Sequence, residues 1–251
     1  FNATVASLGA GNAAGTITNS AAGSGTNTLT ITSFTTNLAS LITDGATAKT
    51  GLLFNNSSSV PWFSNANNTF SGGLTIGSGG STRIYQLGAM TNTLVNGTLT
   101  KSNFGTGTVY IGANGSTAAA QLMLSSGSVY NNIVVNAGAT YADGGRAAFR
   151  IDGTVALYGT LTAGASDISL SNGSGTGSAT AYGQLTGTNG LLLNPSQGTA
   201  FTLTLANTAN AANNYSGNTT ISANTILALG AANQIANGAG KGNLIINSGN
   251  F

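Results

Sequence analysis

Four of the ten charged residues of this chain lie within ten consecutive positions, at Asp143, Arg146, Arg150 and Asp152. Arginine and aspartate side chains on the outer face of a sheet suit an enzyme that cleaves polysaccharides, so the four residues are a candidate sugar-acting site. The structural alternative is two ion pairs, Asp143 with Arg146 and Arg150 with Asp152. An exposed ion pair contributes only about 0–1 kcal/mol. We expect the structural role, a charged contact without catalysis.

Composition excludes most other catalytic chemistry. The chain has no His and no Cys, and the sequence contains no Glu, so neither a Ser-His-Asp arrangement nor a His or Cys zinc site is available. Calcium-binding β-rolls repeat a Gly-Gly-x-Gly-x-Asp pattern, whereas Asp143-Gly144-Gly145 is a single, unrepeated approximation. The glycine-rich run 77–80 opens no helix and therefore does not match a phosphate-binding loop. We expect no enzymatic activity, no metal and no cofactor.

The charge content also limits the partners. Only 4% of residues are charged and the net charge is +2, against about 25% charged residues in ordinary soluble domains. Six dispersed cations do not form the clustered phosphate contacts that nucleic-acid binding requires. Apolar runs such as 191–193 and 244–246 are far shorter than the roughly 18 residues of a membrane helix. Low net charge favours self-association, so the expected partner is a second copy of the chain.

Short strands must position these residues, because helix signals are nearly absent. Gly, Asn, Thr and Ser interrupt each stretch before the roughly 10–12 periodic residues of a helix accumulate. Apolar residues alternate with Thr, Ser or Asn, which is the period-two pattern of strands, and Asn-Gly and Asp-Gly turns separate many of them. The expected strands are 28–32, 73–76, 93–100, 108–111, 128–135, 154–162, 191–193, 200–206, 219–222 and 243–247.

An internal repeat indicates how the strands are arranged. The block Asn67 to Ile76 returns 145 residues later as Asn213 to Ile221, with Tyr215 in place of Phe70. Long-range repeats of strand-and-turn units are typical of stacked solenoids. Two features of composition favour the same architecture. The abundant Asn side chains can form ladders between coils. Charged residues are scarce, as expected if each would lie about 4.8 Å from a like charge in the next coil. A β-sandwich with glycine-rich loops is the alternative.

The aromatic residues allow two interpretations. Exposed tyrosine and phenylalanine faces would suit an adhesin or a glycan-binding surface. The structural interpretation, which we favour, is that Tyr85, Tyr110, Tyr130 and Tyr158 stack along the coils as an aromatic ladder.

The C-terminal third of the chain resembles the autotransporter-associated β-strand repeat in four successive segments. They are the segment 183–191, the strand 201–205, the corner Asn214-Tyr215-Ser216-Gly217-Asn218-Thr219 and the strand ending in Leu229-Gly230. The block 68–76 matches the later half of that pattern, with Phe70 where the family has Tyr. Asn218 stands where the family has a second glycine. The resemblance implies a right-handed β-solenoid on the outer surface of a Gram-negative-type bacterium, built from repeats that serve as scaffold.

We therefore predict an all-β fold, a right-handed parallel β-helix formed by a single domain, 1–251. Repeat-like blocks are expected near 67–111 and 183–247. At roughly 20–25 residues per coil, the chain would form about 10–12 coils, and at about 4.8 Å per coil a rod on the order of 50 Å long.

The predicted function is a structural subunit of a bacterial extracellular filament, sheath or surface layer. Apolar residues near both ends would form the polymer interface, with the strand 243–247 pairing with 3–8 or 26–32 of the next copy. The expected interface residues are Phe1, Val5, Leu8, Leu29, Ile31, Leu244, Ile245, Ile246 and Phe251. Alternatives are an autotransporter-type adhesin passenger that acts as an isolated arm and a carbohydrate-active β-helix enzyme.

Overall fold

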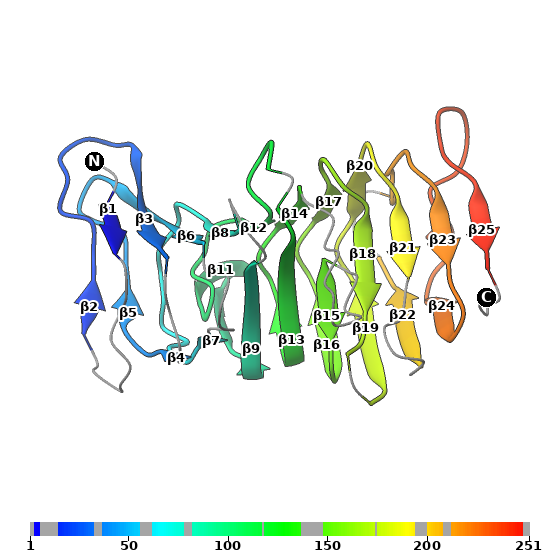
Figure 1. The fold of residues 1–251 in the computed structure, drawn as a ribbon, viewed down its shortest axis with the longest axis horizontal. Helices are drawn as coiled ribbons and strands as arrows, with labels where there is room; N and C mark the ends of the chain where they lie inside the picture. The colour runs from blue at the N-terminus through cyan, green and yellow to red at the C-terminus, as the bar shows by residue number, and fades with distance from the viewer. Residues whose placement is uncertain are drawn as a thin grey trace.

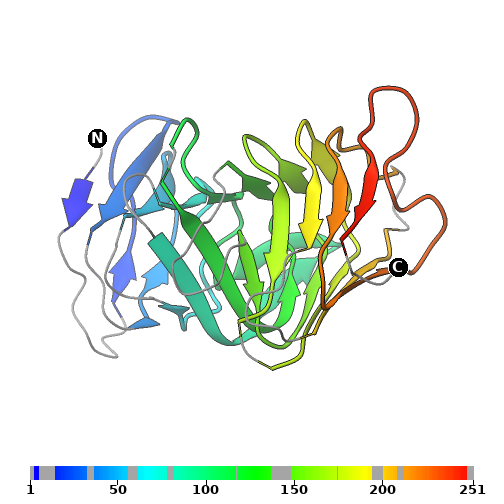
Figure 2. The ribbon, with the colours of Figure 1, turned by 45° about the vertical axis from the view of Figure 1, so that its right-hand side comes forward.

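The computed structural model describes residues 3–5, 15–32, 37–55, 62–77, 82–116, 118–136, 148–173, 175–193, 200–207 and 212–247. Within these ranges all regular secondary structure is β-strand, with no helix, as the period-two patterns predict. The strands stack side by side from the N-terminal to the C-terminal end (Figure 1), and the turned view shows their layers enclosing the interior (Figure 2). The fold is a parallel β-solenoid.

Two large sheets form the walls of the solenoid. The eight-stranded sheet contains, in spatial order, β1 (Ala3–Val5), β3 (Thr26–Ile31), β6 (Lys49–Phe54), β8 (Leu74–Ile76), β12 (Val109–Ile111), β14 (Ile133–Val135), β17 (Leu161–Ala163) and β20 (Leu185–Gly187). The eleven-stranded sheet contains β9 (Thr82–Met90), β13 (Ala120–Val129), β15 (Phe149–Ile151), β16 (Thr154–Leu157), β18 (Ile168–Ser171), β19 (Gly177–Ala181), β21 (Leu191–Leu193), β22 (Phe201–Leu205), β23 (Thr219–Ile221), β24 (Thr225–Leu229) and β25 (Leu244–Ile246).

Three two-stranded sheets complete the fold: β2 (Thr16–Ile17) with β5 (Leu41–Ile42), β4 (Asn37–Leu38) with β7 (Trp62–Phe63), and β10 (Asn92–Val95) with β11 (Thr98–Ser102). The β10–β11 pair is an antiparallel hairpin, whereas the pairs of the two large sheets are parallel.

The long strand β13 divides the eleven-stranded sheet into two columns. Its residues 122–124 pair with β15, and its residues 127–129 pair with β16. From β14 to β22, each turn adds one strand to the eight-stranded sheet and one to each column of the other sheet. The solenoid is therefore three-sided in this half of the molecule.

The solenoid has about eight turns, so the prediction of 10–12 coils was too high. Leu52 pairs with Leu74, 22 residues later, but Leu74 pairs with Val109, 35 residues later. The longer turn contains the hairpin β10–β11, which leaves the stack and adds residues without adding a rung. Other turns also exceed the assumed length of roughly 20–25 residues, since Ala3 pairs with Leu29, 26 residues later, and Ile133 with Leu161, 28 residues later. The insertion and these longer turns together lower the number of coils.

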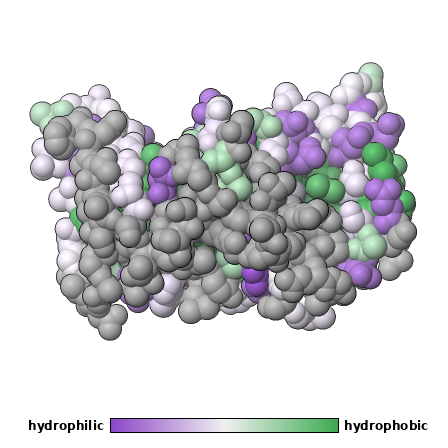
Figure 3. All heavy atoms as spheres, viewed as in Figure 1, coloured by the Kyte–Doolittle hydropathy of each residue, from purple (hydrophilic) through white to green (hydrophobic). Residues whose placement is uncertain are grey.

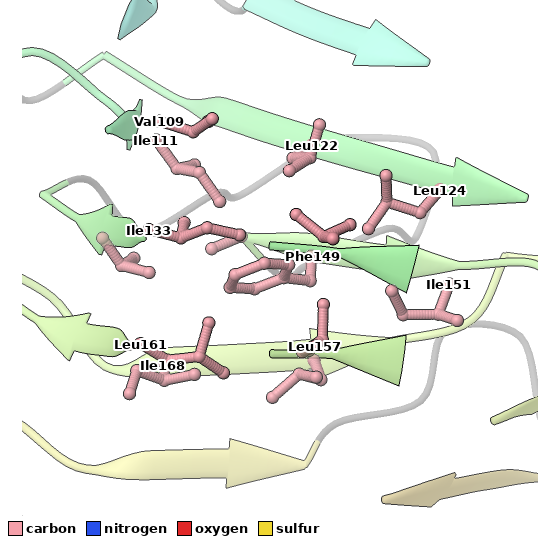
Figure 4. Packing of buried hydrophobic residues seen from close by; sticks show 14 of the residues in the cluster. Val109, Ile111, Leu122, Leu124, Ile133, Phe149, Ile151, Leu157, Leu161 and Ile168 are labelled. Atoms are coloured by element: carbon pink, nitrogen blue, oxygen red, sulfur yellow. The ribbon is translucent and has the colours of Figure 1, made fainter. Parts of the chain in front are cut away.

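Inward-pointing side chains form continuous apolar columns. The strands β12, β14 and β17 each bury their first and third residues and leave the second half-buried. Residues from several successive strands point into the space between the sheets in Figure 4, among them Ile133, Leu161 and Phe149, all essentially inaccessible to solvent. Each fully buried side chain of this size contributes about 1.5–3 kcal/mol, so stacking itself is the main source of stability.

The two copies of the repeat build the same corner in different sheets. The Asn68 side chain accepts a hydrogen bond from the backbone N–H of Ile42, and the Asn213 side chain accepts one from Leu185 N–H. The aromatic residue two positions later, Phe70 or Tyr215, is fully buried. The first copy continues into β8 of the eight-stranded sheet and the second into β23 of the other sheet. The motif thus encodes a local corner and not a fixed place in the fold.

Asparagine side chains join coils mainly through the backbone. Asn131 Nδ2 donates to the carbonyls of Gly105 and Gly107, and Asn189 Nδ2 donates to the Gly164 carbonyl of the preceding coil. Each bond satisfies a backbone group at a turn, where no ladder partner is available. These two asparagines serve as caps between coils.

Candidate functional site

Two of the four residues of the charged cluster, Arg150 and Asp152, are described by the structure, and they form an ion pair. Arg150 Nε lies 2.9 Å from Asp152 Oδ1, as the structural interpretation predicts. The same carboxylate oxygen accepts the backbone N–H of Gly173 at 2.9 Å. Asp143 and Arg146 lie outside the described residues.

The Arg150 side chain lies against the next coil. A Cβ added to Gly173 would be 1.8 Å from Arg150 Nε, so the guanidinium occupies the space that only glycine leaves open. Arg150 and Asp152 therefore hold two coils together, and both groups are already engaged by the protein itself.

The other described carboxylates also cap backbone groups. Asp44 Oδ1 accepts the N–H groups of Thr50 and Ser71 at 2.8 and 3.0 Å, and Asp167 Oδ1 accepts Gly190 N–H at 2.7 Å. In the described ranges no group of three or more potential metal-binding side chains occurs. The arrangement of these carboxylates suits turn formation between successive coils.

The N-terminal part of the expected polymer interface is corrected by the sheet order. β3, which contains Leu29 and Ile31, pairs with β1 on one side and β6 on the other. Both residues therefore lie inside the stack, and Ile31 is fully buried. Val5 belongs to the edge strand β1. Phe1 and Leu8 lie outside the described residues.

The C-terminal part of the expected interface is exposed. Leu244 and Ile246 are 43% and 48% exposed, although their partners in β23, Thr219 and Ile221, are buried. Ile245 is half-buried, and Phe251 lies outside the described residues. Because β25 belongs to the eleven-stranded sheet and β1 to the other, a continuous stack of copies does not place these two strands opposite each other.

A second strand at the same end, β24, was expected from the repeat as the strand ending in Leu229-Gly230, but its exposure was not. Leu229 is 43% exposed, whereas its partner Leu205 in β22 is fully buried, and Ile226 is also exposed. Hydrophobic residues gather at this C-terminal edge in the space-filling view (Figure 3). The repeat could have indicated this exposure, because β24 directly follows the second copy and lies near the same end of the stack.

The aromatic ladder is confirmed in part. Tyr130 stacks on Tyr158 and Tyr158 on Tyr182, with centroid separations of 4.4 and 4.8 Å and nearly parallel planes. Tyr182 was not among the expected members. Tyr110 lies on the eight-stranded sheet, away from this stack, and the structure does not describe the side chain of Tyr85.

Tyr215 is a fully buried residue whose hydroxyl group lies in an otherwise apolar interior. Its hydroxyl lies 2.5 Å from the Thr219 hydroxyl. Burial raises the pKa of Tyr215 above its ordinary value, and hydrogen bonds with Thr219 and the Ala236 backbone partly oppose this rise. The residue remains neutral at physiological pH and serves packing.

Comparisons of the chain with protein-family models, curated proteins and solved structures found no match. The resemblance to the autotransporter-associated repeat therefore stays a prediction. In the part of the chain that the structure describes, there is no helix with the length and apolar character needed to cross a membrane.

Proposed function

We propose that the chain is a non-enzymatic structural subunit of a bacterial extracellular filament, sheath or surface layer, and that it associates end to end with copies of itself. The observation that supports this proposal most strongly is the open C-terminal turn. There, the inward-pointing columns that are buried along the stack end in exposed Leu229, Leu244 and Ile246. Covering each of them would contribute up to about 1.5–3 kcal/mol.

Backbone groups at this turn support the same role. Within the described residues, β24 pairs only with β22 and β25 only with β23. Within these residues each strand has a partner on one side alone, and soluble proteins normally block such an edge with charge, proline or a covering segment. In the N-terminal turn of another copy, β2 pairs only with β5 and β4 only with β7 among the described residues, so strand edges are available there, and a head-to-tail contact of this kind propagates into a fibre.

The carboxylates also favour a scaffold over an enzyme. Asp44, Asp152 and Asp167 each accept a backbone N–H from a neighbouring coil. Groups committed to such hydrogen bonds contribute to stability and are poorly placed for proton transfer. The extracellular, bacterial setting rests on the resemblance to the autotransporter-associated repeat.

The test compares Ile246→Lys with Val95→Lys. Ile246 is on the open turn, whereas Val95, 55% exposed, is on the β10–β11 hairpin. Both positions are exposed, so both variants should fold with unchanged circular dichroism spectra. In sedimentation and negative-stain microscopy we expect long rods for the wild type and for Val95→Lys, and single rods for Ile246→Lys.

A wild-type chain that stays monomeric would contradict the proposed assembly, and isolated rods would then favour the adhesin-type arm. Equal loss of assembly in both variants would show that the C-terminal turn is not the specific contact.

A further inference from the structure

We propose that a groove on the outer face of the eight-stranded sheet binds an uncharged polysaccharide. The groove has a volume of about 590 Å³ and is lined by Thr75, Tyr110, Val134, Asn114, Asn136 and Gly164, among others. This volume is within the range of about 300–1,000 Å³ typical of ligand sites. The proposal is independent of end-to-end assembly, because the groove lies on the side of the stack.

The outward row of this sheet brings the groove residues together from successive turns. Tyr110 pairs with Thr75 on one side and with Val134 on the other. Tyr110 is the only aromatic residue in the row Thr30, Leu53, Thr75, Tyr110, Val134, Thr162 and Thr186, as far as the described registers define it. The groove therefore has one aromatic surface, flanked by Thr75 on one side and Val134 on the other.

Gly73 determines how the tyrosine ring lies. A Cβ at Gly73 would be 3.3 Å from Tyr110 Cε2, so the ring packs over this glycine, near the start of the strands. The turns that contain Asn114, Asn136 and Gly164 follow the ends of β12, β14 and β17. The ring and the turns thus border the groove from opposite ends of the strands.

The amide wall is positioned by the fold. Asn136 Nδ2 donates to the Gly112 carbonyl of the preceding turn, and a Cβ at Gly164 would be 2.5 Å from Asn136 Oδ1. Neighbouring coils therefore fix the Asn136 amide before any ligand binds, which reduces the entropy cost of binding.

The chemistry of the groove selects the ligand class. An aromatic ring offers a surface for the C–H face of a sugar, and amide and hydroxyl side chains offer partners for sugar hydroxyls. No lining residue is charged, so the groove provides no counter-charge for an acidic sugar. An added peptide strand is excluded, because β12 is already paired on both sides.

The spacing of the coils also suits a chain of sugars. Equivalent positions recur about every 4.8 Å along the stack, close to the length of one residue in an extended polysaccharide. Lining residues from β8 to the turn after β17 span four successive rungs, so the groove accommodates a short run of sugar units along the solenoid.

Affinity electrophoresis of the full chain tests the proposal. The gels contain hydroxyethylcellulose, xyloglucan or galactomannan as neutral polymers, and alginate or polygalacturonate as acidic ones. We expect retardation by at least one neutral polymer and none by the acidic polymers. Tyr110→Ala should weaken binding at least about tenfold, Asn114→Ala should weaken it less, and Tyr110→Phe should retain most of it because the ring remains.

Tyr158→Ala is the matched control, since Tyr158 is an exposed tyrosine outside the groove and its loss should leave binding unchanged. Thermal unfolding verifies that each variant is folded. Failure of all three neutral polymers to retard the wild type, equal binding by Tyr110→Ala, or preferred binding of an acidic polymer would overturn the proposal. If Tyr110→Ala does not fold, Asn114→Ala on its exposed turn decides the outcome.

Discussion

At the scale of single residues, the two repeat copies differ in a matched way. Tyr215 has Thr219 four positions later, and their hydroxyls are hydrogen-bonded. The first copy has Phe70 and, four positions later, Leu74, and both are fully buried without a hydroxyl. Each buried corner thus contains either two hydroxyls that are hydrogen-bonded to each other or no hydroxyl at all. A single buried hydroxyl without a partner would destabilise the fold.

The raised pKa of Tyr215 predicts a loss of stability at alkaline pH. An unfolded tyrosine ionises near pH 10, while the folded-state pKa of Tyr215 is higher because the ring is buried. Between these two values the folded state retains a proton that the unfolded state has lost, so the free energy of unfolding falls as pH rises. Below about pH 10 this contribution is fully present.

Urea unfolding at pH 8 and pH 11 measures this effect. The decrease in unfolding free energy should be smaller for Tyr215→Phe than for the wild type. Tyr158→Phe, at an exposed position of the tyrosine stack, should behave as the wild type. An identical decrease in wild type and Tyr215→Phe would refute the assignment.

At the scale of strands and turns, glycine sets how closely two coils approach. A Cβ at Gly217 would lie 2.4 Å from the backbone nitrogen of Gly190, and a Cβ at Gly72 would lie 2.5 Å from the Thr50 carbonyl oxygen. Both are the glycine of the repeated corner. The corner motif keeps this residue because backbone atoms of the preceding coil occupy the place of a side chain.

Gly217→Ala should therefore destabilise the protein by about 1–3 kcal/mol, the usual cost of overpacking. Gly25→Ala is the control, because nothing lies within 4 Å of its added Cβ, and it should be neutral or slightly stabilising. Chemical unfolding measures both variants. Equal stability of the two would mean that the coils separate without cost at the corner.

At the scale of the whole molecule, scarce charge determines how the proposed assembly responds to solution conditions. The open turn offers apolar side chains and strand edges, and the chain has only ten charged residues. Ionic screening acts on charges and leaves apolar burial intact. A contact of this type depends little on ionic strength.

We accordingly expect the fibres to persist in 1 M salt and from about pH 5 to pH 9, where ordinary Asp, Lys and Arg side chains do not titrate. Light scattering during salt and pH titration measures assembly. Dissociation in 1 M salt alone would indicate a contact held by ion pairs, contrary to the proposal.

Much of the molecule follows from the sequence by local rules. Alternation of apolar residues with Thr, Ser and Asn specified strands, since side chains of a strand alternate between faces. The repeated Asn-x-aromatic-Ser-Gly corner indicated stacked coils, and Arg150 and Asp152, two positions apart, could be expected to pair. These features depend on neighbours in the chain, which the sequence displays directly.

Tertiary structure decided what depends on neighbours between coils. Turn lengths that vary from 22 to 35 residues set the number of turns, and pairing on both sides placed Leu29 and Ile31 inside the stack. The groove joins Tyr110 to Thr75 and Val134 across separations of 35 and 24 residues. Because coil length varies along the chain, residue spacing alone does not give the register of one coil on the next, and register determines which side chains meet and which remain uncovered.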